Sequence, residues 1–214
     1  MNTPIALVEN LYSSYGADNV GYLICSQTKN SIYFIADGHS QRVGSAELVR
    51  LFIQYLNKNL NLVTITGHDI QSKINGYLFD FKESVKRILP RAAMCFVIVV
   101  KIDNFLHVFY LGDCRLGKFI KNNIEWITKP HSYVLQNKPN MTEEELRVSE
   151  YNHVIYKQFS TTKFLNPDYV KFDLTDSEYI LATDGLWKLL PEKQALILSK
   201  KFAQLEDDVA FLRF

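Results

Sequence analysis

The pattern of apolar and polar positions changes its period several times along the 214 residues of the chain. Short apolar runs bounded by turn residues predict strands, and apolar residues spaced three and four apart predict helices. The predicted strands cover residues 20–25, 32–36, 94–102, 106–111, 116–121, 124–128, 169–174, 178–183 and 209–214. The predicted helices cover residues 45–60, 68–89, a short segment from 142, and 186–202 with a break near Pro191. Ser45 is the expected cap of the first helix, and Pro90 closes the second.

The order of these elements predicts a layered α+β fold. A hairpin comes first, then two helices that we expect to pair antiparallel, then four strands whose short connections imply an antiparallel meander. We expect a four-layer α-β-β-α sandwich, in which two antiparallel sheets pack face to face and helices flank them on the outside. Because 47% of the residues are hydrophobic, the chain can bury one substantial core, and we expect a single domain over residues 1–214.

Composition and charge exclude several classes of function. The formal net charge is +1 with mixed signs along the chain, so we expect no nucleic-acid partner. The longest apolar run, Ala92–Val100, is too short for a membrane span, and Met1–Tyr12 is unlike a signal peptide. Cys25, Cys95 and Cys114 lack zinc-site spacing, which indicates reduced thiols in the cytoplasm. Export to another compartment stays open, and the pattern predicts no oligomeric state.

Three acidic turns each follow an apolar strand and are candidates for metal binding. Hard divalent cations prefer oxygen ligands, and a strand-end aspartate beside glycine can present its carboxylate where the backbone approaches closely. One Asp-Gly pair alone is most often an ordinary β-turn. Here a further acidic pair precedes the last strand, so the chain contains four acidic motifs in sequence. They are Asp37-Gly38-His39, Gly112-Asp113-Cys114-Arg115, Thr183-Asp184-Gly185-Leu186-Trp187 and Asp207-Asp208-Val209.

With these motifs the sequence resembles protein phosphatase type 2C, a family of metal-dependent serine/threonine phosphatases, in a compact, bacterial-type form. In that family Asp-Gly-His, Gly-Asp-Ser-Arg, Asp-Gly-Leu-Trp and a late Asp-Asn occur in the same order, and the match extends over nearly the whole chain. The resemblance implies two antiparallel sheets sandwiched between helix pairs, in agreement with the pattern above. It also implies hydrolysis of phosphoserine and phosphothreonine in protein substrates.

The resemblance further implies two Mn²⁺ or Mg²⁺ ions and a role for each matching residue. A water molecule activated by the cations would attack the phosphoryl group directly, without a phosphoenzyme, and His39 would protonate the leaving oxygen. The implied ligands are Asp37 as the bridging carboxylate, Gly38 through its carbonyl, Asp184 and Asp207 at the second cation, Asp18 through water, and Asp113 at a third, weaker cation.

The sequence departs from the family pattern beside the first acidic motif. The usual phosphate-binding basic residue is missing from residues 11–15, and Ala17 replaces an acidic or amide residue. Arg42 is the candidate substitute for substrate binding. One alternative is a weak or inactive pseudophosphatase that serves as a metal-containing binding or regulatory module. Another is an unrelated β-rich binding domain with ordinary Asp-Gly turns. The family's flap insertion, which contacts the substrate, is at most residues 139–163 here. Small phosphorylated metabolites are therefore alternative substrates to phosphoproteins.

Overall fold

The computed structural model describes residues 3–10, 17–121, 123–201, 205 and 207–214, which form two antiparallel sheets. One sheet has the strand order β1-β11-β10-β6-β7, and the other has β2-β3-β4-β5-β9, with β8 paired to β4. The strands of the first sheet are β1 (Ile5–Glu9), β6 (Arg115–Ile120), β7 (Asn123–Trp126), β10 (Tyr179–Ala182) and β11 (Val209–Arg213). Those of the second are β2 (Asp18–Ile24), β3 (Ser31–Gly38), β4 (Ala93–Ile102), β5 (Phe105–Leu111), β8 (Phe159–Ser160) and β9 (Asp168–Asp173).

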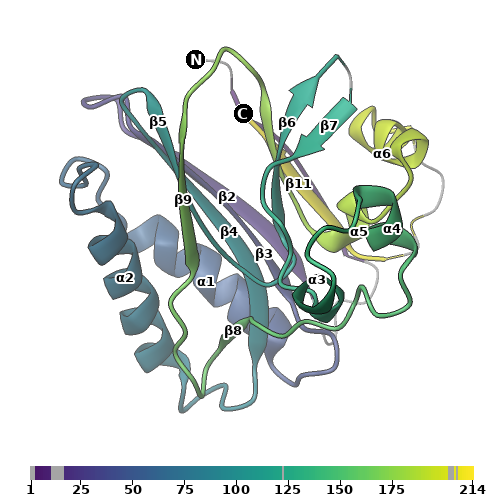
Figure 1. Cartoon of the computed structure of the whole chain (residues 1–214). Helices are drawn as coiled ribbons and strands as arrows, with labels where there is room; N and C mark the ends of the chain where they lie inside the picture. The colour runs from purple at the N-terminus through teal and green to yellow at the C-terminus, as the bar shows by residue number, and fades with distance from the viewer. Residues whose placement is uncertain (1–2, 11–16, 122, 202–204, 206) are drawn as a thin grey trace.

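Helices flank the pair of sheets on both outer sides (Figure 1). The helices α1 (Ser45–Asn59) and α2 (Ile70–Val85) pack on the second sheet. The short helices beside the first sheet are α3 (Tyr133–Asn137), α4 (Glu143–Val148), α5 (Asp184–Trp187) and α6 (Pro191–Leu198). This arrangement confirms the expected four-layer α+β sandwich.

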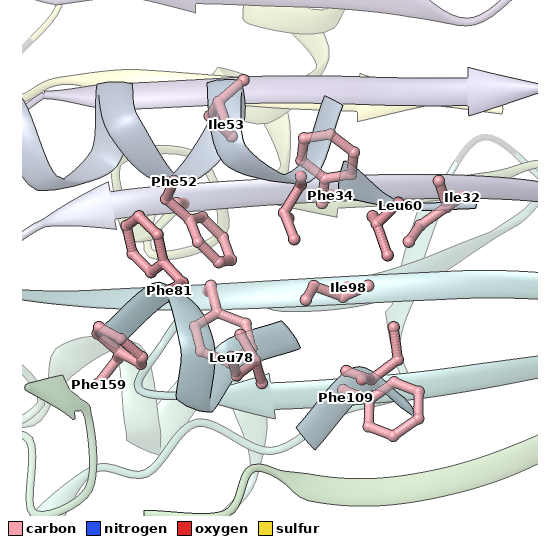
Figure 2. Close-up of a cluster of buried hydrophobic side chains, with 14 of the residues drawn as sticks. Ile32, Phe34, Phe52, Ile53, Leu60, Leu78, Phe81, Ile98, Phe109 and Phe159 are labelled. Atoms are coloured by element: carbon pink, nitrogen blue, oxygen red, sulfur yellow. The ribbon is translucent and has the colours of Figure 1, made fainter. Parts of the chain in front are cut away.

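The interior strand β3 is buried on both faces, which explains its unbroken apolar run. Alternate side chains of a strand point to opposite faces. Ile32 and Phe34 therefore pack against the helices, in the cluster with Phe52 and Phe81 that Figure 2 shows. Tyr33 and its alternating neighbours pack instead against the first sheet. Each such buried side chain stabilises the fold by about 1.5–3 kcal/mol. One cluster therefore holds the helices on the second sheet, and the other holds the two sheets together.

Helix α1 begins where it was predicted, but its cap differs. Gly44 is the capping residue, with φ 86°, a left-handed conformation that glycine adopts without strain. Ser45 is already helical, and its hydroxyl accepts a 3.2 Å hydrogen bond from the Ala93 backbone N–H. The prediction of Ser45 as the cap was therefore wrong. Helix α2 also ends before Pro90, at Val85, and residues 86–88 form a turn.

The predicted meander of four strands is wrong at one connection. The strands β4 and β5 pair in the second sheet, whereas β6 and β7 pair in the first. The chain crosses between the sheets at Gly112, whose φ is 90°. A side chain there would place Cβ 2.1 Å from Cys95 Sγ, so only glycine fits this crossing. Short turns alone did not distinguish a crossing from a hairpin.

The ends of the described chain meet in one sheet. Strand β1, which the apolar pattern missed, pairs antiparallel with β11, and Ile5 lies opposite Arg213. The predicted helix over residues 186–202 is two short helices separated at residues 188–190, and residue 202 lies outside the described residues. Helix α3 and strand β8 were also missed. Within the described residues no helix has the length and apolar character needed to cross a membrane.

Candidate active site

The acidic turns that follow the strands meet in one cleft with a volume of about 540 Å³. Strands of both sheets and the segment that precedes β11 contribute to its wall. All eight residues singled out in the sequence line this cleft, although they come from distant parts of the chain. They are Asp18, Asp37, Gly38, His39, Arg42, Asp113, Asp184 and Asp207.

Asp18 and Asp37 form the centre of the acidic wall. They are direct partners in the antiparallel pair of β2 and β3, and their carboxyl groups are hydrogen-bonded to each other. Burial is the main cause that raises the pKa of both, and for Asp37 repulsion from Asp18 adds to it. A 2.6 Å hydrogen bond from Thr183 Oγ1 to Asp18 Oδ2 partly opposes the shift. The pair therefore retains a proton to a higher pH than isolated carboxyl groups do.

A tight turn after β3 presents His39 and Arg42. The Arg42 backbone N–H donates a 3.0 Å hydrogen bond to the His39 carbonyl. His39 Nδ1 accepts a 3.3 Å bond from the Gln41 N–H, which places the ring proton on Nε2. Burial, followed by the charge of Arg42, lowers the pKa of His39. The close approach of Gly38 to helix α1 fixes this turn, because a Cβ on Gly38 would lie 3.0 Å from the Ser45 carbonyl oxygen.

Asp113 lies buried at the crossing between the sheets. Its backbone carbonyl accepts a 2.7 Å hydrogen bond from Trp187 Nε1, and its carboxylate is hydrogen-bonded to the thiol of Cys95. Burial, followed by repulsion from Asp184, raises the pKa of Asp113 to about 6, against the opposing charge of Lys188. The Asp113 carboxylate is therefore held next to the turn that carries Asp184.

Asp184 begins α5 and pairs with Lys188 at the end of the same turn. Lys188 Nζ lies 2.6 Å from Asp184 Oδ2 and 3.5 Å from Asp113 Oδ2. Burial acts to lower the pKa of Lys188, but the charges of Asp184 and Asp113 outweigh it and raise the pKa. An ammonium group is thus part of the acidic cluster.

The segment before β11 approaches α5 closely at Gly185. A Cβ on Gly185 would lie 1.9 Å from the carbonyl oxygen of Asp208, so only glycine fits there. Asp207 is exposed at the rim of the cleft, and its carboxylate accepts a 2.9 Å hydrogen bond from the Asp208 N–H. The glycine of the Asp-Gly-Leu-Trp motif therefore brings the late acidic residues next to Asp184.

Arg115 has a structural role behind the cleft. It is 0% exposed, donates from Nε to the Thr128 carbonyl at 2.8 Å, and forms a two-pronged ion pair with Glu143 at 2.6 and 2.8 Å. Its guanidinium group also lies 5.0 Å from the ring centre of Trp187. Arg115 therefore fixes the Asp113 turn and the Trp187 helix rather than facing the cleft.

The donor atoms of the cleft suit hard divalent cations, although the side chains are not arranged around one ion. Within the described residues, no three His, Cys, Asp or Glu side chains are placed to hold a metal ion. Asp18 is bonded to Thr183 and Asp37, and Asp184 is bonded to Lys188. Carboxylate and carbonyl oxygens are nevertheless the ligands that Mn²⁺ and Mg²⁺ prefer, and the buried carboxyl groups repel one another without a cation. Binding would require the Asp18–Asp37 pair to lose its proton and side chains to rotate.

Several residues in the cleft or in contact with its acidic groups were not predicted from the sequence. Lys188 follows Asp184 by four residues, a spacing that places both on one helix face and that gives a usable signal. Thr183 belongs to the quoted motif, but its bond to Asp18 requires knowledge of the sheet order. From the short flap segment, His153 and Gln158 line the cleft. Residues 11–15, which lack the family's usual basic residue, lie outside the described residues.

Comparisons with known proteins support the fold. No protein-family model matches the sequence, and no curated protein matches it. Among solved structures, the serine/threonine phosphatase Stp1 from Staphylococcus aureus is 18% identical with a TM-score of 0.78, and covers 100% of this chain and 94% of its own. The serine/threonine phosphatase of S. agalactiae is 13% identical with a TM-score of 0.77, over 99% and 98%.

A third solved structure was determined with metal. The catalytic domain of the serine/threonine protein phosphatase PstP, in complex with two manganese ions, is 15% identical with a TM-score of 0.64 over 99% of this chain and 98% of its own. At such identities these matches establish the fold, which is that of bacterial serine/threonine phosphatases over the whole chain. The fold implied by the type 2C resemblance is therefore confirmed.

Proposed function

We propose that this chain is a metal-dependent serine/threonine phosphatase that hydrolyses phosphomonoesters of proteins. The observation that carries the proposal is the convergence of Asp37, Asp113, Asp184 and Asp207 in one cleft, beside His39 and Arg42. These residues come from separate segments of the chain, and carboxyl groups with raised pKa values that gather in one cleft are typical of a functional site. The fold shared with serine/threonine phosphatases supports the same conclusion.

The cofactors in this proposal are two Mn²⁺ or Mg²⁺ ions. Asp37 would bind both ions, and Gly38 would contribute its backbone carbonyl. Asp184 and Asp207 would complete the ligands of the second ion, and Asp18 would act through water. When bound, such ions lower the pKa of a water molecule and stabilise the charge on a phosphoryl group. The low exposure of Asp18, 2%, keeps the inner side of the site away from bulk solvent.

The remaining steps belong to side chains of the turn after β3. The Arg42 guanidinium carries a permanent positive charge into the cleft and would bind the substrate phosphate. His39 would donate the proton of its Nε2 to the leaving serine or threonine oxygen. Because burial and Arg42 lower the pKa of His39, the protonated form is scarce at neutral pH, so this step should be favoured as the pH falls.

Phosphate release from a phosphothreonine peptide tests this proposal. With Mn²⁺ present the wild type should release phosphate, and Asp184→Asn should abolish most of that activity. Asp80→Asn is the matched control, because Asp80 is exposed on α2 and far from the cleft in the fold. If Asp184→Asn and Asp80→Asn are equally active, the proposed site is wrong.

A second candidate function is a metal-containing binding module without turnover. The pairing of Asp184 with Lys188 favours it, because a bound ammonium reduces the negative charge available to cations. Isothermal titration calorimetry with the same phosphopeptide separates the two functions. Binding of the peptide with Mn²⁺ but without phosphate release would support the binding module.

A further inference from the structure

Lys188 lies inside the acidic cluster, and its position is fixed by the fold. Its side chain is 18% exposed, and Nζ lies 5.4 Å from the ring centre of Trp187. Trp187 is itself held by the 2.7 Å hydrogen bond from Nε1 to the Asp113 carbonyl. The Lys188 backbone N–H also closes α5 by donating to the Asp184 carbonyl. The ammonium group is therefore directed to the carboxylates by the same helix that positions Asp184.

The ammonium group lies between two carboxylates that would otherwise repel each other. Nζ is 2.6 Å from Asp184 Oδ2 and 3.5 Å from Asp113 Oδ2. Asp113 is 4% exposed, so water screens little of the repulsion between its charge and that of Asp184. A cation shared by these two carboxylates would have to occupy the space that Nζ already fills. The two positive charges would also repel each other at short range.

We propose that Lys188 is a built-in cation that replaces a divalent ion between Asp113 and Asp184 and so limits the cleft to two ions. This inference rests on the proposed two-cation function. It replaces the third, weaker cation that the type 2C resemblance implied at Asp113. Lys188 then acts as a positioning residue, because its bond to Oδ2 holds the Asp184 carboxylate beside that of Asp113.

The number of Mn²⁺ ions bound per chain, measured by equilibrium dialysis of the full chain, tests the inference. The wild type should bind two ions. Lys188→Asp should bind three, because it removes the ammonium and adds an oxygen ligand, and the third ion should be lost again in Lys188→Asp with Asp113→Asn. Lys188→Gln keeps the shape without the charge, and should gain weaker binding of a third ion even if Lys188→Asp folds poorly.

The matched control is Lys73→Asp on α2. Lys73 and Asp69 form an ion pair of the same spacing and the same 2.6 Å length, but on the protein surface. This variant should bind two ions, like the wild type. A third ion in Lys73→Asp would show that added surface charge, rather than the Asp113–Asp184 position, accounts for the gain, and would overturn the inference.

The outcomes separate this inference from the proposed function. Three ions in the wild type, or two in both folded Lys188 variants, would overturn the role of Lys188 and leave the phosphatase proposal standing. Fewer than two ions in the wild type would overturn the two-cation function. In that case one additional ion in Lys188→Asp that depends on Asp113 would still support the exclusion by Lys188, and no additional ion would overturn both.

Discussion

Thr183 Oγ1 donates a 2.6 Å hydrogen bond to Asp18 Oδ2, and so joins two residues that are 165 positions apart in the chain. Asp18 begins a strand of the second sheet, whereas Thr183 follows β10 of the first. The same hydroxyl accepts a 3.0 Å bond from the Ala210 N–H. One buried threonine therefore connects both sheets beside the acidic cluster.

Replacing Thr183 with valine should destabilise the protein by about 2–3 kcal/mol, because the shape is kept while Asp18 and the Ala210 N–H lose their partner in a buried position. Urea unfolding measures the effect. Thr183→Ser keeps the hydroxyl and should cost about 1 kcal/mol for the lost methyl group. Equal stability of the two variants would show that the bond to Asp18 contributes little.

Gly185→Ala should lower the free energy of unfolding by about 1–3 kcal/mol or more, because its Cβ would meet the Asp208 carbonyl oxygen at 1.9 Å. It should also lower activity, since the backbone beside Asp207 must move. Gly76→Ala is the control, because no atom lies within 4 Å of its Cβ and alanine favours the helix by about 0.5–1 kcal/mol. Thermal unfolding that shifts both variants in the same direction would contradict the close packing at Gly185.

Without metal, Asp113 should make the protein less stable as the pH rises from 5 to 7.5, against the opposite effect of His39, His107 and His131, whose pKa values are lowered in the folded state. The folded pKa of Asp113 is raised to about 6 from 3.8, so the folded state binds more protons than the unfolded state between these values. This contribution, on the order of 3 kcal/mol in total, is fully present below the unfolded pKa and is lost as the pH rises through the folded pKa, and about half of it is lost between pH 5 and 7.5. Asp18 and Asp37 act in the same direction.

Urea unfolding in EDTA at both pH values measures this dependence. Asp113→Asn should show a flatter dependence, and the difference between the variant and the wild type isolates the contribution of Asp113. Excess Mn²⁺ should reduce the part of the fall that comes from Asp37, because the cations of the proposed site bind its ionised carboxylate. An identical pH dependence in the variant would contradict the raised pKa.

His39→Gln should slow the hydrolysis of a phosphothreonine peptide by about 10²-fold, because the threonine oxygen needs a proton as it leaves. The same variant should lose less than about tenfold on para-nitrophenyl phosphate, whose phenolate leaves without protonation. Steady-state rates on both substrates measure the contrast. His68→Gln, at an exposed position, is the control and should change neither rate. An equal loss on both substrates would assign His39 to binding or structure instead of proton donation.

The sequence predicted most strands and the long helices, because their apolar patterns depend on local burial. Asp37 and Asp184 could also be identified locally, since each follows a buried strand and precedes glycine. The crossing at Gly112 could not be predicted, because it depends on contact with Cys95 from another strand. The same holds for the cap at Gly44, where the Ser45 hydroxyl is used by Ala93 instead.

Strand β1 was missed for a related reason. Its burial pattern is partly exposed without a clear alternation, and it is held by pairing with β11 at the other end of the chain. The role of Lys188 was missed because it depends on a contact with Asp113, which lies in the segment that crosses between the two sheets. The local sequence therefore indicated which carboxylates matter, whereas the tertiary fold determined what neutralises them.

The most direct test of the central claim is the rate of phosphate release from a phosphothreonine peptide as Mn²⁺ is added to the wild type and to Asp37→Asn. The account predicts a wild-type rate that rises with Mn²⁺ to saturation and disappears in EDTA. It predicts a loss on the order of 10²–10³-fold in Asp37→Asn at saturating Mn²⁺. A wild-type rate that is independent of Mn²⁺, or an Asp37→Asn variant as active as the wild type, would contradict it.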